Sequence, residues 1–156
     1  MCCVRNNSEK GGRQMLDTVN LLKECDAGTK MAVSSIDDVL DKVTDDALKG
    51  LLQESKNHHK ELEKQIVEEL DKHKAEEKEP NPMAKGMSWM KTNVKMGMDN
   101  SDATVADLIT DGCNMGIKSL YKYLNQYKDA DKKAKDICNK LIDIEETLRK
   151  DLRGHL

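Results

Sequence analysis

The sequence predicts an all-α protein, an up-and-down four-helix bundle, and three observations carry the prediction. Four long segments repeat apolar residues at helical spacing, the first and last junctions are short turns, and the middle junction is a long connection over 79–101. The apolar residues are mainly Leu, Ile, Val, Ala and Met, and Phe is absent, which favours helices over sheets. A chain of 156 residues suits one domain. We therefore expect a flexible tail over 1–12 and a single bundle domain over 13–156.

The first helix is expected over about 12–43. Its apolar residues recur at alternating intervals of four and three, which keeps one face toward a partner helix. Cys25 and Asp26 lie on this face, and Gly28 follows them, lowering the local helix preference by about 1 kcal/mol relative to Ala. The expected stripe is Met15, Val19, Leu22, Thr29, Val33, Ile36, Leu40 and Val43.

The second helix is expected over about 44–78. Thr44 can cap its first turn, and Asp45 and Asp46 would lie at the positive end of the helix dipole. Because only a turn separates the first two helices, they should be antiparallel neighbours. The expected stripe is Leu48, Leu51, Leu52, Ser55, His58 or His59, Leu62, Ile66, Leu70 and His73.

The long connection begins where Pro80 and Pro82 stop the second helix, and it is long enough to traverse the bundle. Apolar residues at intervals of 4, 3 and 4 predict a short amphipathic helix within it. This helix could pack across the bundle, which we favour, or bind a protein partner or a second copy of the chain; attachment to a membrane surface is the least favoured alternative. The candidate interaction residues are Met83, Met87, Trp89, Met90 and Val94.

The third and fourth helices are expected over about 102–127 and 132–153. Asp99 to Ser101 marks the start of the third, and the short turn between the two helices predicts a second antiparallel pair. The stripe of the third helix is Ala106, Ile109, Cys113, Gly116, Leu120, Tyr123 and Tyr127. The stripe of the fourth is Ala134, Ile137, Leu141, Ile144, Leu148 and Leu152, with Glu145 beside it.

Charge and cysteine usage exclude several classes of function. The 26 basic and 29 acidic residues are interleaved, so nucleic-acid binding is not expected. Without an apolar run of 18 residues or an apolar N-terminal segment, we expect a cytoplasmic protein. Five widely spaced cysteines without a C-x-x-C pair argue against a disulfide framework and a zinc site. No phosphate-binding loop or nucleophile elbow is present.

The runs 21–25, 58–62 and 141–146 resemble the ferritin-like superfamily in its small rubrerythrin-related branches. The stretches 87–95 and 111–118 are similar to an uncharacterised bacterial set of these proteins. The resemblance covers about 13–156, and the order of elements carries most of it. It implies a ferritin-like bundle with a crossover between the second and third helices.

The resemblance also implies a ligand pattern for two irons. The family pattern takes one Glu from the first helix, Glu-x-x-His from the second, one Glu from the third and Glu-x-x-His from the fourth. The matching positions here are Cys25, Ser55-x-x-His58, Cys113 and Glu145-x-x-Leu148. Only His58 and Glu145 keep the ligand type, so a complete di-iron centre is not expected.

Two hypotheses of function follow. The first is a non-enzymatic structural or binding protein without a cofactor, which contacts a protein partner or forms a homodimer through the crossover helix. The alternative is a metal-binding or redox protein that holds Fe or Zn in a mixed site. The residues of that site would be Cys25, Asp26, His58, Cys113 and Glu145. Under the first hypothesis the cysteines fill the core, Asp26 is exposed at an edge or paired, and Glu145 belongs to a solvated face.

Overall fold

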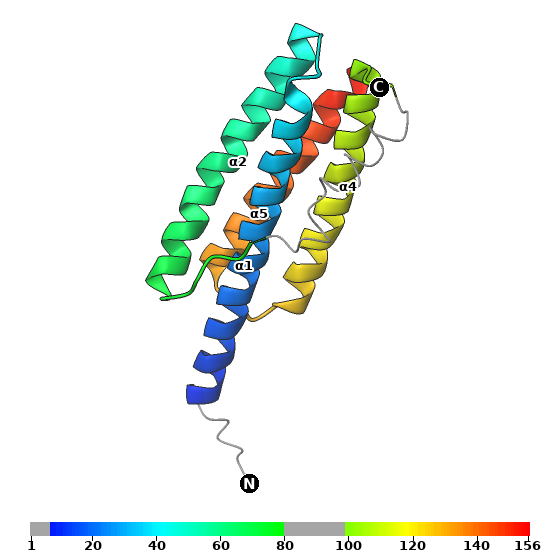
Figure 1. The fold of residues 1–156 in the computed structure, drawn as a ribbon. Helices are drawn as coiled ribbons and strands as arrows, with labels where there is room; N and C mark the ends of the chain where they lie inside the picture. The colour runs from blue at the N-terminus through cyan, green and yellow to red at the C-terminus, as the bar shows by residue number, and fades with distance from the viewer. Residues whose placement is uncertain (1–6, 80–98) are drawn as a thin grey trace.

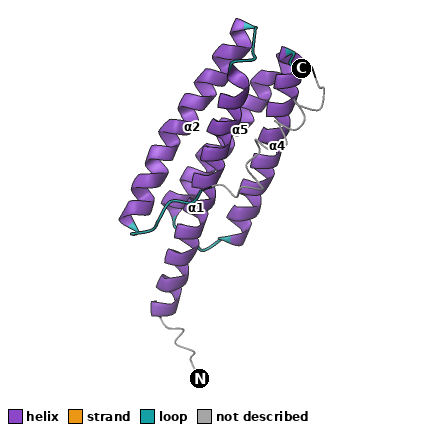
Figure 2. Cartoon of the chain, in the orientation of Figure 1, coloured by secondary structure: helices purple, strands orange, loops and turns teal. Residues whose placement is uncertain are grey.

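The computed structural model describes residues 7–79 and 99–156, and these residues form helices joined by short loops, without a strand (Figure 2). The helices are α1 (Asn7–Leu40), α2 (Asp46–Lys72), α4 (Asp102–Gln126) and α5 (Lys132–Asp151), followed by the 3-10 helix η1 (Leu152–His155). For this part of the chain, the prediction of an all-α fold with four long helices is confirmed. The predicted crossover helix, with Met83, Met87, Trp89, Met90 and Val94, lies outside the described residues.

The four long helices pack side by side in the cyclic order α1, α2, α5, α4, and α1 also contacts α5 across the diagonal. Helices α1 and α5 run in one direction, and α2 and α4 run in the other (Figure 1). Helix α2 therefore ends at the opposite end of the bundle from the start of α4. None of the described helices has an apolar stretch long enough to cross a membrane.

Helix α1 begins earlier than predicted, at Asn7 instead of about Gly12, and its first turns project beyond the other helices (Figure 1). Residues 8–16 are all exposed, so Met15, predicted to lie in the packed stripe, faces solvent. Once a helix has formed, each further residue adds a backbone hydrogen bond, and the helix can continue without packing. At its other end α1 stops at Leu40, although Val43 is still buried.

The turn between α1 and α2 is fixed by two carboxylates. Asp45, and not Thr44 as predicted, caps α2, because Leu48 N–H donates to Asp45 Oδ1 at 2.7 Å. Thr44 instead donates from its backbone N–H and its hydroxyl to Asp102, at 2.8 and 2.7 Å. Asp102 is the first residue of α4, so these bonds join the α1–α2 turn to the other helix pair.

The C-terminus of α2 lies six residues before the predicted end near Lys78. Lys74 adopts a φ of 52°, its N–H donates to Asp71 O at 2.9 Å, and Ala75 N–H donates to Leu70 O at 2.9 Å. These two bonds are the pair that defines a Schellman motif. The motif ends the helix although good helix formers follow it in the sequence.

The core consists of two apolar clusters, one in each half of the bundle. The first cluster includes Leu21, Ile66 and Ile137. The second cluster includes Ile36 and Leu52. Between the two clusters lies a layer of buried polar side chains. The members of this polar layer are Thr29, Ser55, His59 and Glu145.

Candidate functional site

The polar layer is built around a buried pair, His59 on α2 and Glu145 on α5. His59 is fully buried, Glu145 is 7% exposed, and His59 Nε2 lies 3.0 Å from Glu145 Oε1. His59 Nδ1 lies 2.8 Å from the carbonyl oxygen of Ser55, and because a carbonyl only accepts, Nδ1 carries a hydrogen. One further proton must then lie between Nε2 and Oε1. The pair is either imidazolium with carboxylate or neutral imidazole with carboxylic acid, and it holds this proton in both forms.

Cys113 and Gly116 of α4 border the carboxyl group of Glu145. Burial, and then the charge of Glu145 and a hydrogen bond to it, raise the pKa of the Cys113 thiol well above its ordinary value. A Cβ at Gly116 would lie 3.7 Å from Glu145 Cδ, so the glycine leaves room for the carboxyl group. The raised pKa keeps Cys113 as a protonated thiol, which is a poor nucleophile.

The structure corrects two of the predicted site residues. His58, predicted as the imidazole ligand, is exposed, and the buried imidazole belongs to His59. Glu145, which we predicted for a solvated face under the binding hypothesis, is buried. The signal for both was the spacing: His59 follows Ser55 by four residues, and Glu145 follows Leu141 by four, so each continues the stripe of its helix.

Asp26 is fully buried and paired, one of the two environments predicted for it. Its Oδ2 accepts from Lys30 Nζ at 3.0 Å and from Lys78 N–H at 2.9 Å, whereas Oδ1 has no hydrogen-bond partner among the described residues. Desolvation raises the pKa of Asp26, and the two hydrogen bonds oppose the rise. Lys30 also pairs with Glu77 and Glu79, at 3.4 and 3.2 Å. These contacts anchor the segment after α2 against α1.

The two buried cysteines of the predicted metal site lie in different clusters. Cys25 belongs to the first cluster and Cys113 to the second, so they do not face one another. Cys25 instead shares the first cluster with Cys138 on α5. Within residues 7–79 and 99–156, no three His, Cys, Asp or Glu side chains are grouped so that they could hold a metal ion.

The polar layer also does not fit a di-iron centre. Such a centre needs several bridging and terminal carboxylates, and this layer supplies one, from Glu145. Ser55 and Cys113 stand where the family pattern has carboxylates, and Leu148 stands where it has an imidazole. We therefore assign no iron chemistry to the layer.

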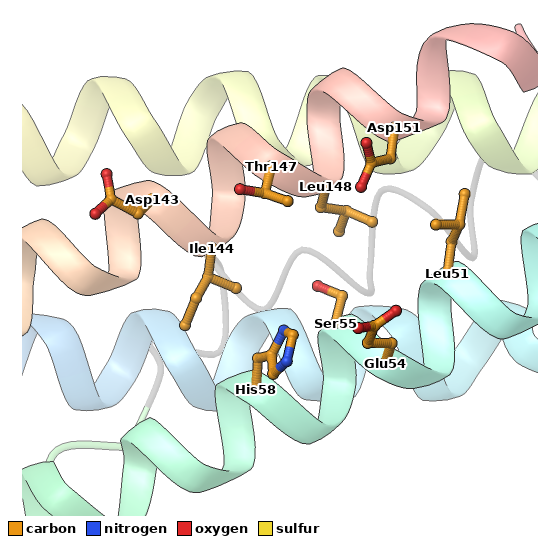
Figure 3. Close-up of a pocket in the computed structure, with 9 residues that line it drawn as sticks. All are labelled: Leu51, Glu54, Ser55, His58, Asp143, Ile144, Thr147, Leu148 and Asp151. Carbon is orange, nitrogen blue, oxygen red and sulfur yellow. The ribbon is translucent and has the colours of Figure 1, made fainter.

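A groove lies on the surface between α2 and α5, close to the polar layer, and has a volume of about 230 Å³. Side chains of the two helices face each other across it (Figure 3). Its lining comprises Leu51, Glu54, Ser55, His58, Asp143, Ile144, Thr147, Leu148 and Asp151. The groove was not predicted from the sequence. Its residues come from α2 and α5, and the sequence does not specify how these two helices align along the bundle axis.

Comparisons of the chain with protein-family models, curated proteins and solved structures give no match. The functional proposal therefore rests on the geometry of the polar layer and of the groove.

Proposed function

We propose that this chain is a ferritin-like bundle without a complete di-iron centre, and that it serves as a non-enzymatic binding protein. Its binding surface is the α2–α5 groove, and its ligand is a basic amphipathic segment of a protein partner. The helix directions and the long connection between the antiparallel pairs support the ferritin-like part of the proposal (Figure 1). The neutral thiol of Cys113 and the mutual pairing of His59 and Glu145 support a role without catalysis.

The observation that carries the proposal is the chemistry of the groove lining. Leu51, Ile144 and Leu148 give it an apolar floor, and three exposed carboxylates surround this floor (Figure 3). No lysine or arginine is among the described residues that line it. The carboxylates are those of Glu54, Asp143 and Asp151. Apolar side chains between lysines or arginines would complement this surface.

The size of the groove decides between two kinds of ligand. Sites for small molecules and cofactors usually have volumes of about 300–1,000 Å³. At about 230 Å³ the groove is smaller, and it suits one or two side chains of a partner. A buried apolar side chain contributes about 1.5–3 kcal/mol, and an exposed ion pair about 0.2–1 kcal/mol. The apolar anchor should therefore supply most of the affinity, and the carboxylates should supply the preference for a basic segment.

A helical probe peptide made of Leu and Lys tests this proposal, with a Leu and Glu peptide of the same length as its control. We expect the full chain to bind the lysine peptide and not the glutamate peptide, measured by fluorescence anisotropy. The triple variant Glu54→Gln, Asp143→Asn, Asp151→Asn should weaken binding about tenfold. The matched variant Glu68→Gln, Asp107→Asn, Asp111→Asn removes three exposed carboxylates outside the groove, and it should weaken binding much less.

Equal losses in the two triple variants would contradict the proposal, because they would show a nonspecific effect of net charge. The metal hypothesis has a separate test, the elemental analysis of protein purified without added metal. Stoichiometric Fe or Zn that disappears in Cys113→Ala and in His59→Ala would replace the binding proposal with a metal site in the polar layer.

A further inference from the structure

Helices α1 and α5 are parallel and keep one register along the first half of the bundle. Thr18 Oγ1 accepts from Asp131 N–H at 2.8 Å, and these residues are 113 positions apart in the sequence. A Cβ on Gly28 would lie 3.6 Å from Leu141 Cδ2, and Gly28 and Leu141 are also 113 positions apart in the sequence. Because the two contacts have the same sequence separation, the parallel helices keep the same relative position along their axes from the first contact to the second.

Cys25 and Cys138 lie between these two contacts and are also 113 positions apart in the sequence. Both side chains are fully buried in the first apolar cluster, and both are free thiols. Cys138 Sγ donates to Leu120 O at 3.9 Å, and the two thiols are close enough to shift each other's pKa. The register of the two helices thus places Cys25 and Cys138 at the same height in the bundle, within one apolar cluster.

We propose that Cys25 and Cys138 form a redox site in which a small peroxide converts the two thiols into an interhelical disulfide. This inference goes beyond the proposed binding function and does not depend on it. Burial selects the class of oxidant: a peroxide of nearly the size of water can enter through a local opening, whereas a bulky disulfide such as oxidised glutathione cannot reach the sulfurs. The two sulfur atoms must approach to about 2.05 Å for the bond to form, and residues at the same height on neighbouring helices are the pairs for which this movement is smallest.

Either thiol can react first, because exchanging the roles of Cys25 and Cys138 leaves the products unchanged. The interaction between the two thiols lowers the pKa of Cys138, whereas that interaction, followed by burial, raises the pKa of Cys25. With Cys138 reacting first, its sulfur attacks one peroxide oxygen, the O–O bond breaks, and a sulfenic acid and water form. The sulfur of Cys25 then attacks the sulfenic sulfur, the S–O bond breaks, and a second water leaves with the proton of Cys25. In total the two thiols lose two electrons and two protons, and hydrogen peroxide is reduced to two waters.

Peptide mapping of the full chain tests the site. The chain carries Cys2→Ser and Cys3→Ser to remove the thiols of its first residues, and it is treated with hydrogen peroxide, alkylated and digested with trypsin without reductant. We expect a linked pair of peptides, residues 24–30 joined to residues 136–140, which dithiothreitol separates. We also expect the oxidised protein to unfold at a higher urea concentration, because the disulfide closes a long loop.

Two variants and one condition complete the design. Cys113→Ser should keep the linked peptides, because Cys113 lies in the other cluster, and Cys138→Ser should abolish them. The proposal is overturned if Cys25 and Cys138 both stay reduced in the folded chain at peroxide concentrations that oxidise N-acetylcysteine. Linkage of either residue to Cys113, or linkage that forms only in urea, would overturn it as well. The result for the parent chain decides the matter even if Cys138→Ser fails to fold.

Discussion

At the scale of single residues, the pair of His59 and Glu145 is the most consequential feature. Removing two polar groups from water is costly, and their mutual hydrogen bond and the carbonyl of Ser55 offset part of this cost. Such a pair adds little net stability, but the loss of either partner leaves the other buried without its hydrogen bond. The pair therefore specifies how α2 and α5 face each other more than it stabilises the fold.

A double-mutant cycle measures this dependence. Each of the single variants His59→Leu and Glu145→Leu should lower the free energy of unfolding by about 3–5 kcal/mol, because each leaves a buried polar partner unpaired. The double variant should lose less than either single variant. Urea denaturation checks this expectation, and additive losses in the double variant would show that the two side chains do not act as a pair.

The same residues show how far sequence reasoning reaches. Helical spacing correctly placed Ser55 and Cys113 in the core, and it left His58 and His59 open as alternatives. The resemblance to the ferritin-like pattern then favoured His58, because that pattern spaces its ligands by three residues. The chain uses the four-residue spacing instead, since this turns the imidazole of His59 toward Glu145.

At the scale of the helices, the C-terminus of α2 is unusual because Lys74 occupies the left-handed position of the Schellman motif. Glycine usually takes this position, since other residues with a Cβ are strained there. Ala75 packs against the cluster that contains Leu70, which supplies the apolar contact that accompanies the motif. The tertiary contacts of Asp26 and Lys30 hold the segment that follows.

Replacing Lys74 with glycine should therefore stabilise the chain. Lys74→Gly removes the strain of the left-handed conformation, and we expect the free energy of unfolding to rise by about 1 kcal/mol. Lys60→Gly, in the exposed middle of α2, should lower it by about the same amount. Urea midpoints of the two variants check the contrast. A loss of stability in both would mean that Lys74 contributes more through its contacts than its backbone costs.

Within residues 7–79 and 99–156, the four long helices were predicted in the correct order, but their ends were predicted less accurately. The start of α4 was predicted correctly, because Ser101 caps it through a local hydrogen bond to Thr104 N–H. The end of α2 was not, because the Schellman motif that ends it has Lys74 in the position where glycine is usual. Local signals identify a helix end where the usual residue types stand, and they miss an end where a residue such as Lys74 takes the left-handed conformation.

At the scale of the whole molecule, Asp102 links the two helix pairs at one end of the bundle. Its carboxylate accepts from Thr44 and from Asp45 N–H, and the bonds from Thr44 hold the pKa of Asp102 below its ordinary value. A carboxyl whose pKa is lower in the folded chain stabilises that chain above the unfolded pKa of about 3.9. This stabilisation is lost as the pH falls through the lower, folded value.

The pH dependence of one variant checks this role. The parent chain should unfold at a higher urea concentration than Asp102→Asn at neutral pH, and the difference should stay nearly constant down to about pH 5. Below about pH 4 the difference should shrink as the carboxylate of the folded chain becomes protonated. Asp111→Asn, an exposed position on the same helix, is the control. A difference for Asp102→Asn that does not change with pH would show that the link does not depend on charge.

The first turns of α1, which project beyond the other helices, should differ from the rest of the bundle in amide exchange and in their sensitivity to proteases. Residues 8–16 are helical but exposed all round, and a helix this short is marginal in water by itself. These turns should fray and reform while the bundle stays intact, so their amide hydrogens should exchange with solvent far faster than those of the packed turns that follow. Trypsin should trim the chain at Lys10 and Arg13 long before it cuts inside the bundle.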